Sequence, residues 1–403
     1  MLGWNTLDVV LIAVRIGPTW KRKRRGRSGN HRVGRYYLKS STHVAEPVTA
    51  LFPPQVRNWA LPSEAALTPK AAERVAREAT TQTPDKAAEA LNQDWGTRWD
   101  GRQIDRWVQR FGARLDAEHA AEVAASESGH RPAPPENAPV LLVVGPDGGR
   151  VQMKEKDVET GSRWREDKVL TVTSYLPGDG KEKMPEPLVT THVASMAKTE
   201  EFGRLARVEM DRRGYHSAAQ VLAIADCGNW IDPLLERECP GVERIADWCH
   251  AEEHLYASGR AVCGGKDTPA AKACAEVWAD LLWEGKVTIV IAQLTVRAQE
   301  AGPPQKQDGP DHPRRTLAQN VGYFTKNQAH MKYPEYRAKG WPIGSGNTEA
   351  GVKQFNKRVK GTEQFWSPDG VEAILCLRGC WLSQDGRWRA YWRNRPAYLK
   401  RAA

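Results

Sequence analysis

The chain has 403 residues, which is enough for two or three domains that each bury a hydrophobic core. Charged residues make up 27% of it, and no apolar run approaches the roughly 20 residues that a membrane-spanning helix requires, so an integral membrane protein is excluded. Because the net charge is +10, nucleic acid is the first partner to consider, although a basic enzyme without a polyanionic partner would have the same charge.

The cysteines point to a reducing compartment. There are 7 of them, all in the second half of the chain, and their odd number and irregular spacing do not form a disulfide framework. No C-x-x-C pair is present, which gives a structural zinc site little support. We therefore expect reduced thiols and a cytoplasmic location.

Residues 1–62 form a basic segment without a clear pattern. A run of basic side chains at 21–27 includes Arg22, Arg24 and Arg25. Such a run is usually solvated. Alternatively, it is an arm that binds DNA phosphates and adds affinity without reading the sequence. The residues alone leave both interpretations open.

Residues 63–116 show helical spacing of apolar side chains in three consecutive stretches. The third stretch follows a glycine turn at 96–98 and buries one face, formed by Ile104, Trp107, Val108, Phe111 and Leu115. Its opposite face carries Arg102 and Arg106. This order is typical of a helix-turn-helix, in which Arg102 and Arg106 would face DNA. A plain helical bundle with a solvated basic face is the alternative.

Residues 117–138 are rich in Ala, Glu, Ser and Pro, and we expect a linker there because the prolines cannot continue a helix. In residues 139–395, short apolar runs alternate with segments of helical spacing. We expect strands at 140–144, 150–154, 169–175, 221–225 and 242–246, helices at 202–215 and 230–238 and from 247 onward, and a helical insertion at about 261–337.

This order predicts an α/β fold class. Three antiparallel strands followed by alternating helices and strands are typical of a ribonuclease H-like mixed sheet. The mainly helical insertion would precede the last catalytic helix, and the all-α, helix-turn-helix-like region would precede the sheet.

Three acids take positions where they can meet. Asp147 follows the first expected strand, Asp226 ends the fourth, and Glu349 opens a late helix. In a ribonuclease H-like sheet the first and fourth strands are neighbours, so these carboxylates would converge. They suit two Mg²⁺ or Mn²⁺ ions, which clamp a phosphate at a separation of roughly 3.5–4 Å.

Each acid also has a purely structural interpretation. Asp147 with Gly148 is a hairpin-turn signal. Asp226 is a candidate N-cap of the next helix. Glu349 would favour the positive end of its own helix. Spacing alone leaves the catalytic and the structural interpretations evenly balanced.

A resemblance favours catalysis. The stretch 341–349, which contains the Gly-Ser-Gly-x-x-Glu block and is followed by Lys353, Arg358 and Lys360, resembles the C-terminal signature of bacterial insertion-sequence transposases of the ISKra4 family. Further segments with this likeness are 143–153, 164–169, 226–230, 366–367 and 372–378, so the resemblance covers roughly residues 140–395. Two positions depart from the family pattern, namely Pro146 before the first acid and Cys227 after the second.

The resemblance implies that Asp147, Asp226 and Glu349 are a DDE triad that uses two Mg²⁺ or Mn²⁺ ions. It implies cleavage of element ends and transfer of the 3′-OH strand to a target, with double-stranded DNA as partner and a homo-oligomer as the active form. The protein would be cytoplasmic in a bacterium and associated with the nucleoid when bound to DNA. Lys353, Arg358 and Lys360 would bind the DNA backbone, unless they form a solvated basic helix face.

A second constellation offers rival functions. His250, Glu253 and His254 form H-x-x-E-H, the zinc signature of inverted metallopeptidases. Asp247 and His250 also form D-x-x-H, which resembles an element of several DDE transposase families and would make both residues active-site auxiliaries. The remaining alternative is a transposase-derived protein that binds DNA without cutting it.

Overall fold

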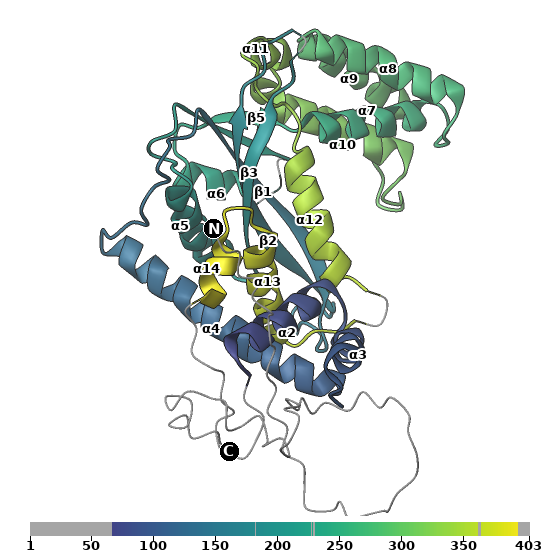
Figure 1. Cartoon of the computed structure of the whole chain (residues 1–403). Helices are drawn as coiled ribbons and strands as arrows, with labels where there is room; N and C mark the ends of the chain where they lie inside the picture. Colours follow the sequence, from purple (N-terminus) through teal and green to yellow (C-terminus); the bar gives the residue numbers. More distant parts are fainter. Residues whose placement is uncertain (1–66, 182, 227, 229, 362–363, 394–403) are drawn as a thin grey trace, which may run out of the picture. The chain divides into compact units, whose positions relative to one another are not determined.

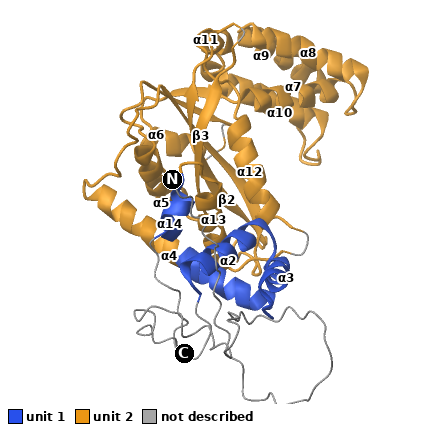
Figure 2. Cartoon of the chain, viewed as in Figure 1, with its two compact units in different colours: residues 1–113, 386–403 blue, residues 114–385 orange. Residues whose placement is uncertain are grey.

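A computed structural model describes residues 67–181, 183–226, 228, 230–361 and 364–393. The expectations for residues 1–62, with Arg22, Arg24 and Arg25, and for Cys227 lie outside this range. The chain divides into two compact units, one formed by residues 1–113 and 386–403 and the other by residues 114–385 (Figure 2). Within the described ranges, no helix is long and apolar enough to span a membrane.

The described part of the first unit is helical. Its elements are α2 (Pro69–Thr81), α3 (Pro84–Trp95), the first part of α4 (Gly101–Glu127) and α14 (Arg387–Arg393). Thr68 caps α2 by accepting a hydrogen bond from the Ala71 N–H at 3.2 Å. Gly96 ends α3 in the left-handed conformation, with φ of 66°, which glycine adopts without steric cost. The helix, glycine turn and helix expected from the sequence are therefore present.

Helix α4 corrects the expected linker. We predicted that the chain leaves the helix after residue 116, but α4 continues to Glu127. The segment 117–127 is rich in Ala and Glu, which have high helix propensity, and the prolines that break helices begin only at Pro132. The nonhelical connection is thus shorter than expected.

The second unit is built on a five-stranded mixed sheet with the strand order β3-β2-β1-β4-β5 (Figure 1). The strands are β1 (Leu141–Gln152), β2 (Trp164–Leu176), β3 (Glu186–Ser195), β4 (Gln220–Ala225) and β5 (Glu243–Ala246). β1 pairs antiparallel with β2, and β2 with β3, whereas β1 and β4, and β4 and β5, are parallel. The predicted adjacency of the first and fourth strands is confirmed.

Two strand assignments from the sequence were wrong. Residues 150–154 do not form a separate hairpin partner, because β1 is continuous from Leu141 to Gln152 and pairs with β2 along its whole length. The strand β3 was not predicted, because its first half is exposed and its sequence lacks a long apolar run. The total of five strands was right, but one expected strand is part of β1.

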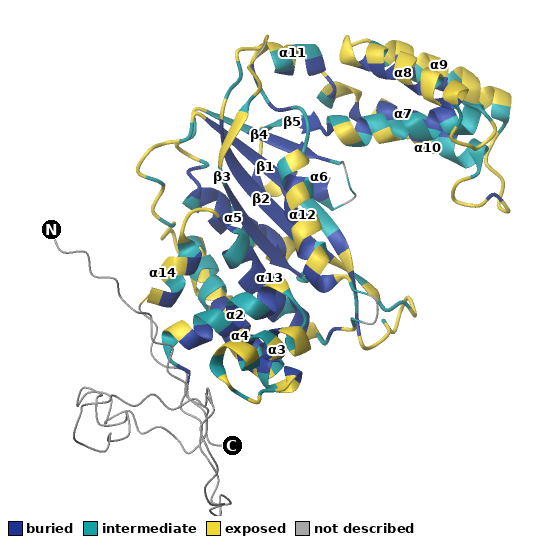
Figure 3. Ribbon diagram, turned by 45° about the vertical axis from the view of Figure 1, so that its right-hand side comes forward, coloured by how far each residue is buried: buried dark blue, intermediate teal, exposed yellow. Residues whose placement is uncertain are grey.

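Helices cover both faces of the sheet. On one face, β1 side chains such as Leu142 and Val144 pack with α5 (Thr199–Arg212) and α6 (Ile231–Glu238). On the other face, Leu141 and Val143 share a core with a helical group. That group comprises α7 (Trp248–Val262), α8 (Pro269–Trp283), α9 (Val287–Ala301), α10 (Pro313–Asn327), a 3₁₀ turn (Gln328–His330) and α11 (Tyr333–Ala338). The strands are mostly buried, while α8 and α9 expose their outer faces (Figure 3).

Two late helices complete the second unit. Helix α12 (Gly346–Val359) packs on β1 and β2, and α13 (Pro368–Leu382) packs on β3. The approach of α12 is close at Gly145, where an added Cβ would collide with the side chain of Thr348. Glycine in β1 therefore serves the contact between helix and strand.

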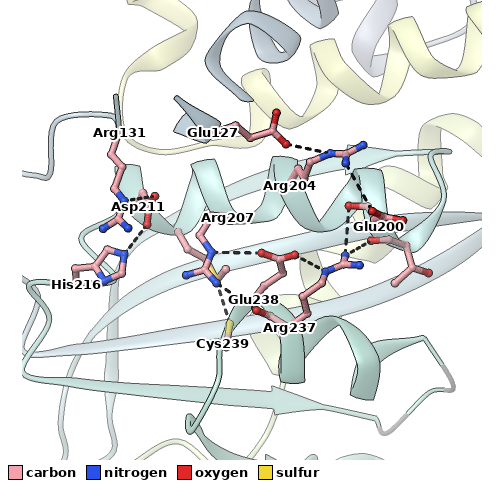
Figure 4. Close-up of polar contacts among 12 residues, drawn as sticks. Glu127, Arg131, Glu200, Arg204, Arg207, Asp211, His216, Arg237, Glu238 and Cys239 are labelled. Carbon is pink, nitrogen blue, oxygen red and sulfur yellow. Dashed lines mark hydrogen bonds and ion pairs between the residues drawn. The ribbon is translucent and has the colours of Figure 1, made fainter. Parts of the chain in front are cut away.

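Ion pairs tie α5 to its neighbours (Figure 4). The Glu238 carboxylate at the end of α6 accepts from Arg207 at 3.3 Å and from Arg237 at 2.7 Å. Asp211, which is 4% exposed, lies 3.1 Å from His216 and 3.8 Å from Arg131. Because most of these partners are partly exposed, the network contributes modestly to stability.

Candidate active site

A pocket of about 200 Å³ opens where β1, β4, α7 and α12 meet. It brings together the three acids singled out in the sequence, together with Asp247 and His250. The complete lining is Pro146, Asp147, Ile224, Ala225, Asp226, Asp247, His250, Glu253, Ser345, Thr348 and Glu349. The acids come from distant parts of the sequence, so their meeting is a property of the fold.

Asp147 lies within β1, where it stands opposite Val169 of β2. Its Oδ1 accepts a hydrogen bond from the Gly148 N–H at 2.6 Å. Gly148 and Gly149 continue the paired strand, so the hairpin-turn interpretation of Asp147 and the expectation that Asp147 follows the strand are both wrong. At Asp147 the strand pairs with β2 alone, because its pairing with β4 ends at Val144.

Asp226 follows directly after β4, the parallel neighbour of β1. Its Oδ1 accepts a hydrogen bond from the Gly228 N–H at 3.2 Å. Helix α6 begins only at Ile231, with Trp230 in the N-cap position, so Asp226 is not the cap of that helix. The carboxyl end of a parallel strand thus delivers this acid to the pocket, as the sequence predicted.

Glu349 lies in the first turn of α12 and accepts a hydrogen bond from Lys353, one turn later, at 2.7 Å. Its position near the helix N-terminus agrees with the helix-dipole interpretation as well. The helix dipole does not by itself explain why Glu349 lines the same pocket as Asp147 and Asp226. That position depends on where α12 packs on the sheet.

Asp247 fixes the loop that precedes α12. It is 3% exposed and caps α7 by accepting from the Cys249 N–H at 3.1 Å. Its carboxylate also accepts from the Ser345 N–H at 3.0 Å and from the Ser345 hydroxyl at 2.7 Å. These contacts make Asp247 a clamp between the start of α7 and the start of α12.

Burial and like charge raise the pKa of Asp147 to about 6. Burial is the largest cause, the Gly148 N–H acts in the opposite direction, and the nearby carboxylates of Asp226, Glu349 and Asp167 raise the pKa further. The pocket therefore concentrates negative charge that a cation would neutralise.

The donor set suits hard divalent cations. Three carboxylates are the kind of ligands that Mg²⁺ and Mn²⁺ prefer, although the imidazole of His250 lines the same pocket. Among the described residues, the only three candidate ligand atoms that lie within 4.8 Å of one another belong to Asp116, Glu372 and Cys376, so the three acids of the pocket are spread more widely. A wider spread leaves room for two ions, which lie about 4 Å apart in two-metal sites.

The group of Asp116, Glu372 and Cys376 is a poor rival metal site. Burial raises the pKa of Glu372, and it holds the pKa of the Cys376 thiol well above its ordinary value. One Glu372 oxygen already accepts from the Met196 N–H at 2.8 Å. Protonated donors disfavour metal binding.

The zinc interpretation of His250 and His254 lacks a third ligand. Catalytic zinc takes three protein ligands. Nε2 of His250 lies 3.2 Å from Nε2 of His254, but within the described residues no third Cys, His, Asp or Glu atom completes a group around this pair. Nδ1 of His254 is engaged by Asn320 at 2.7 Å. The two histidines are better explained as a hydrogen-bonded pair.

The candidate DNA-binding residues have different environments. Lys353 on α12 and Lys360 just after its end are exposed, and Arg102 and Arg106 are exposed on α4. Arg358 is only 2% exposed, and its guanidinium lies 4.9 Å from the ring centroid of Trp366. The expectation that Arg358 binds the DNA backbone is therefore wrong, because the side chain packs in the interior.

Sequence reasoning did not single out Asp167 as a site residue. It is fully buried on β2 opposite Gly149, and neither carboxylate oxygen has a hydrogen-bond partner on another residue. Burial raises its pKa. An added Cβ at Gly149 would lie 2.7 Å from Asp167 and 2.9 Å from the Asn356 side chain. The sequence gives little signal for this role, because Asp167 stands between the charged residues Glu166 and Lys168 at the start of the strand.

Neither a protein-family model nor a curated protein matches the sequence. Among solved structures, the chain is similar to one described as the Drosophila P element transposase strand transfer complex. The sequence identity is 10% and the TM-score is 0.35, and the alignment covers 84% of this chain and 98% of that chain. A similarity at this level carries no conclusion about the reaction, so the interpretation of the pocket depends on its own geometry.

Proposed function

We propose that the chain is a DNA transposase with a ribonuclease H-like catalytic unit, of the kind found in the ISKra4 family. The observation that carries this proposal is the pocket in which Asp147, Asp226 and Glu349 meet from β1, β4 and α12. A strand-centred acid, an acid at the end of the parallel neighbour and a helix-borne acid form a carboxylate set suited to phosphoryl transfer.

In this proposal, the three acids hold two Mg²⁺ or Mn²⁺ ions. Bound there, the ions would activate the attacking oxygen and stabilise the charge that develops on the phosphate. No triad side chain would form a covalent bond to DNA. Water would attack the first strand, and the freed 3′-OH would then attack a second DNA. The pairing of β1 with β2 would hold Asp147 in place, and the Asp247 contacts would hold the start of α12, which carries Glu349.

Other parts of the chain would hold the DNA. Lys353, which pairs with Glu349, and Lys360, which caps the end of α12, are exposed and suit backbone phosphates close to the scissile bond. Arg102 and Arg106 on α4 suit the element end, in a helix-turn-helix region that spans residues 63–116. We further propose that the catalytic unit covers residues 139–395, that the helical insertion lies at about 261–337, and that the active form is a homo-oligomer.

The test measures cleavage and strand joining on labelled DNA that carries the ends of the element, with Mg²⁺ or Mn²⁺. The variant Asp226→Ala should lose both activities and keep DNA binding. The matched control is Asp280→Asn, an exposed acid on α8 that does not line the pocket, and it should remain fully active.

Three outcomes would contradict the proposal in different ways. Full activity of Asp226→Ala would remove Asp226 from the reaction. Binding of DNA by a wild-type protein that never cuts would favour a DNA-binding protein without catalysis. A protein that ignores DNA and retains one Zn²⁺ that His250→Ala loses would restore the metallopeptidase alternative.

A further inference from the structure

A buried amide links the helical insertion to the wall of the pocket. Asn320 on α10 is 3% exposed and contacts α7 through both ends of its side-chain amide. Its nitrogen donates to the His254 carbonyl at 2.9 Å and to the Ser258 hydroxyl at 2.7 Å. Because a carbonyl can only accept, the amide nitrogen must point there, and its oxygen must point to His254.

That orientation settles which nitrogen of His254 carries hydrogen. The Asn320 oxygen lies 2.7 Å from Nδ1 of His254 and can only accept, so Nδ1 must be the donor. Burial lowers the pKa of His254, and the positive form of His250 would lower it further, whereas the Asn320 contact acts in the opposite direction. A neutral His254 with hydrogen on Nδ1 has a bare Nε2, which accepts.

The same logic extends to the pocket. Nε2 of His250 lies 3.2 Å from Nε2 of His254, and one of the two must donate. Since His254 accepts there, His250 carries its hydrogen on Nε2. Its other nitrogen, Nδ1, lies 3.5 Å from the Glu253 carboxylate, and both His250 and Glu253 line the pocket.

The ring of His254 cannot easily turn to undo this arrangement. It stacks on Tyr323 of α10, with 3.9 Å between ring centroids and an angle of 21° between the planes. His250 meets His254 edge-on at 4.7 Å and Tyr323 at 5.8 Å. Packing thus preserves the direction of the hydrogen bonds.

We propose that Asn320 and His254 are positioning residues that hold hydrogen on Nε2 of His250, so that Nδ1, which faces the Glu253 carboxylate, is its only ring nitrogen without hydrogen. This chain of hydrogen bonds, called the relay below, runs from Asn320 of the insertion through His254 of α7 to His250, which lines the pocket. Its effect on DNA cleavage rests on the proposed function, but the tautomers themselves do not.

The first test is direct and needs no variant. Long-range ¹H–¹⁵N correlation spectra of the full chain with ¹⁵N-labelled histidine distinguish imidazole tautomers. At a pH where both rings are neutral, His254 should appear as the Nδ1–H form and His250 as the Nε2–H form. The opposite assignment for either ring would overturn the proposal.

A variant should reverse the relay. In Asn320→Asp, the carboxylate stabilises a positive His254, whose Nε2–H then donates to His250 and moves the hydrogen of His250 to Nδ1. The matched control is Asn327→Ala, which removes another buried amide of α10; this amide donates to the Tyr323 carbonyl of its own helix at 2.8 Å. The control should leave both tautomers unchanged, and an unchanged His250 in Asn320→Asp would contradict the relay.

The catalytic consequence is measured separately. Asn320→Asp should lower the rate of strand cleavage by about 10–100-fold, the usual effect of a second-layer partner, with little change in DNA affinity. An unchanged rate in a variant whose His250 tautomer has switched would overturn the catalytic part. A wild type that does not cut DNA would count against the proposed function, and the tautomer spectra would remain interpretable.

Discussion

Ser345 donates both its backbone N–H and its hydroxyl to the carboxylate of Asp247, at 3.0 Å and 2.7 Å. The same carboxylate caps α7, so one buried side chain aligns the helix that carries His250 with the helix that carries Glu349. This relationship explains how a residue outside the triad controls the shape of the pocket.

Removing the clamp should harm folding and activity together. Asp247→Ala leaves the Cys249 N–H and both Ser345 donors without their partner, and it should cost about 3 kcal/mol in the free energy of unfolding. Ser345→Ala removes one hydroxyl and should cost about 1 kcal/mol. Urea unfolding measures both values. Equal losses for the two variants would argue against a shared carboxylate acceptor.

Neutralising the first acid should stabilise the protein when metal ions are removed. The folded protein binds more protons at Asp147 than the unfolded chain does between pH 3.8 and about 6, so the contribution of Asp147 to stability falls as pH rises through this window. At pH 7 with chelator, Asp147→Asn should therefore raise the free energy of unfolding by on the order of 1–3 kcal/mol.

The comparison for that measurement is Asp280→Asn, which removes an exposed acid of α8 and should change stability little. The gain in Asp147→Asn should shrink as the pH falls from about 6 to 3.8, and it should vanish well below 3.8, where the wild-type carboxyl is protonated in both states. A variant that is less stable than wild type at pH 7 would show that burial and like charge do not make the ionised Asp147 unfavourable in the folded protein.

The approach of α12 to β1 should tolerate no side chain at Gly145. Gly145→Ala places a methyl group against the Thr348 side chain and should destabilise by about 1–3 kcal/mol. Combining it with Thr348→Ala makes room, so the double variant should recover part of the loss. Additive free energies in this double-mutant cycle would contradict a direct contact.

Two cations of one helix should behave oppositely toward DNA. Lys353 has a side chain that is 71% exposed, and Lys353→Ala should reduce the slope of log affinity against log salt by about 1 without changing stability. Arg358→Ala should leave the slope unchanged and lower the unfolding midpoint, because Arg358 packs on Trp366 in the interior. DNA titrations at several salt concentrations separate the two.

The local sequence pattern predicted most strands of the sheet. It failed where glycine is typical both of a turn and of a close contact between a strand and a helix. Gly148 and Gly149 after Asp147 indicate a turn, yet β2 pairs with the chain at both positions and α12 packs over this strand. The close approach that requires glycine is a tertiary feature, so no window of local sequence reveals it. The strand β3 was missed for a related reason. Its composition alone does not indicate a strand, and it is stabilised by its backbone pairing with β2.

For the site, the sequence supplied the acids but not their surroundings. Asp147, Asp226 and Glu349 were identified by position and resemblance, and the fold brings them to one pocket. Charge pattern could not tell Lys353 from Arg358, which differ in burial rather than in type. The partners of Asp247 and His254 depend on loops and helices far along the chain, namely Ser345 and Asn320.

The pocket assembled from β1, β4 and α12 also has a kinetic meaning. β1 and β4 are parallel neighbours, but β2, β3 and α5 lie between them in the sequence, so their pairing closes a long loop. Helix α12 can pack on the sheet only after the whole insertion has been synthesised. Contacts between such distant segments form late, because closing a long loop costs chain entropy before the favourable contacts have formed. A folding intermediate of this chain would therefore hold its first acid in place while still lacking the third.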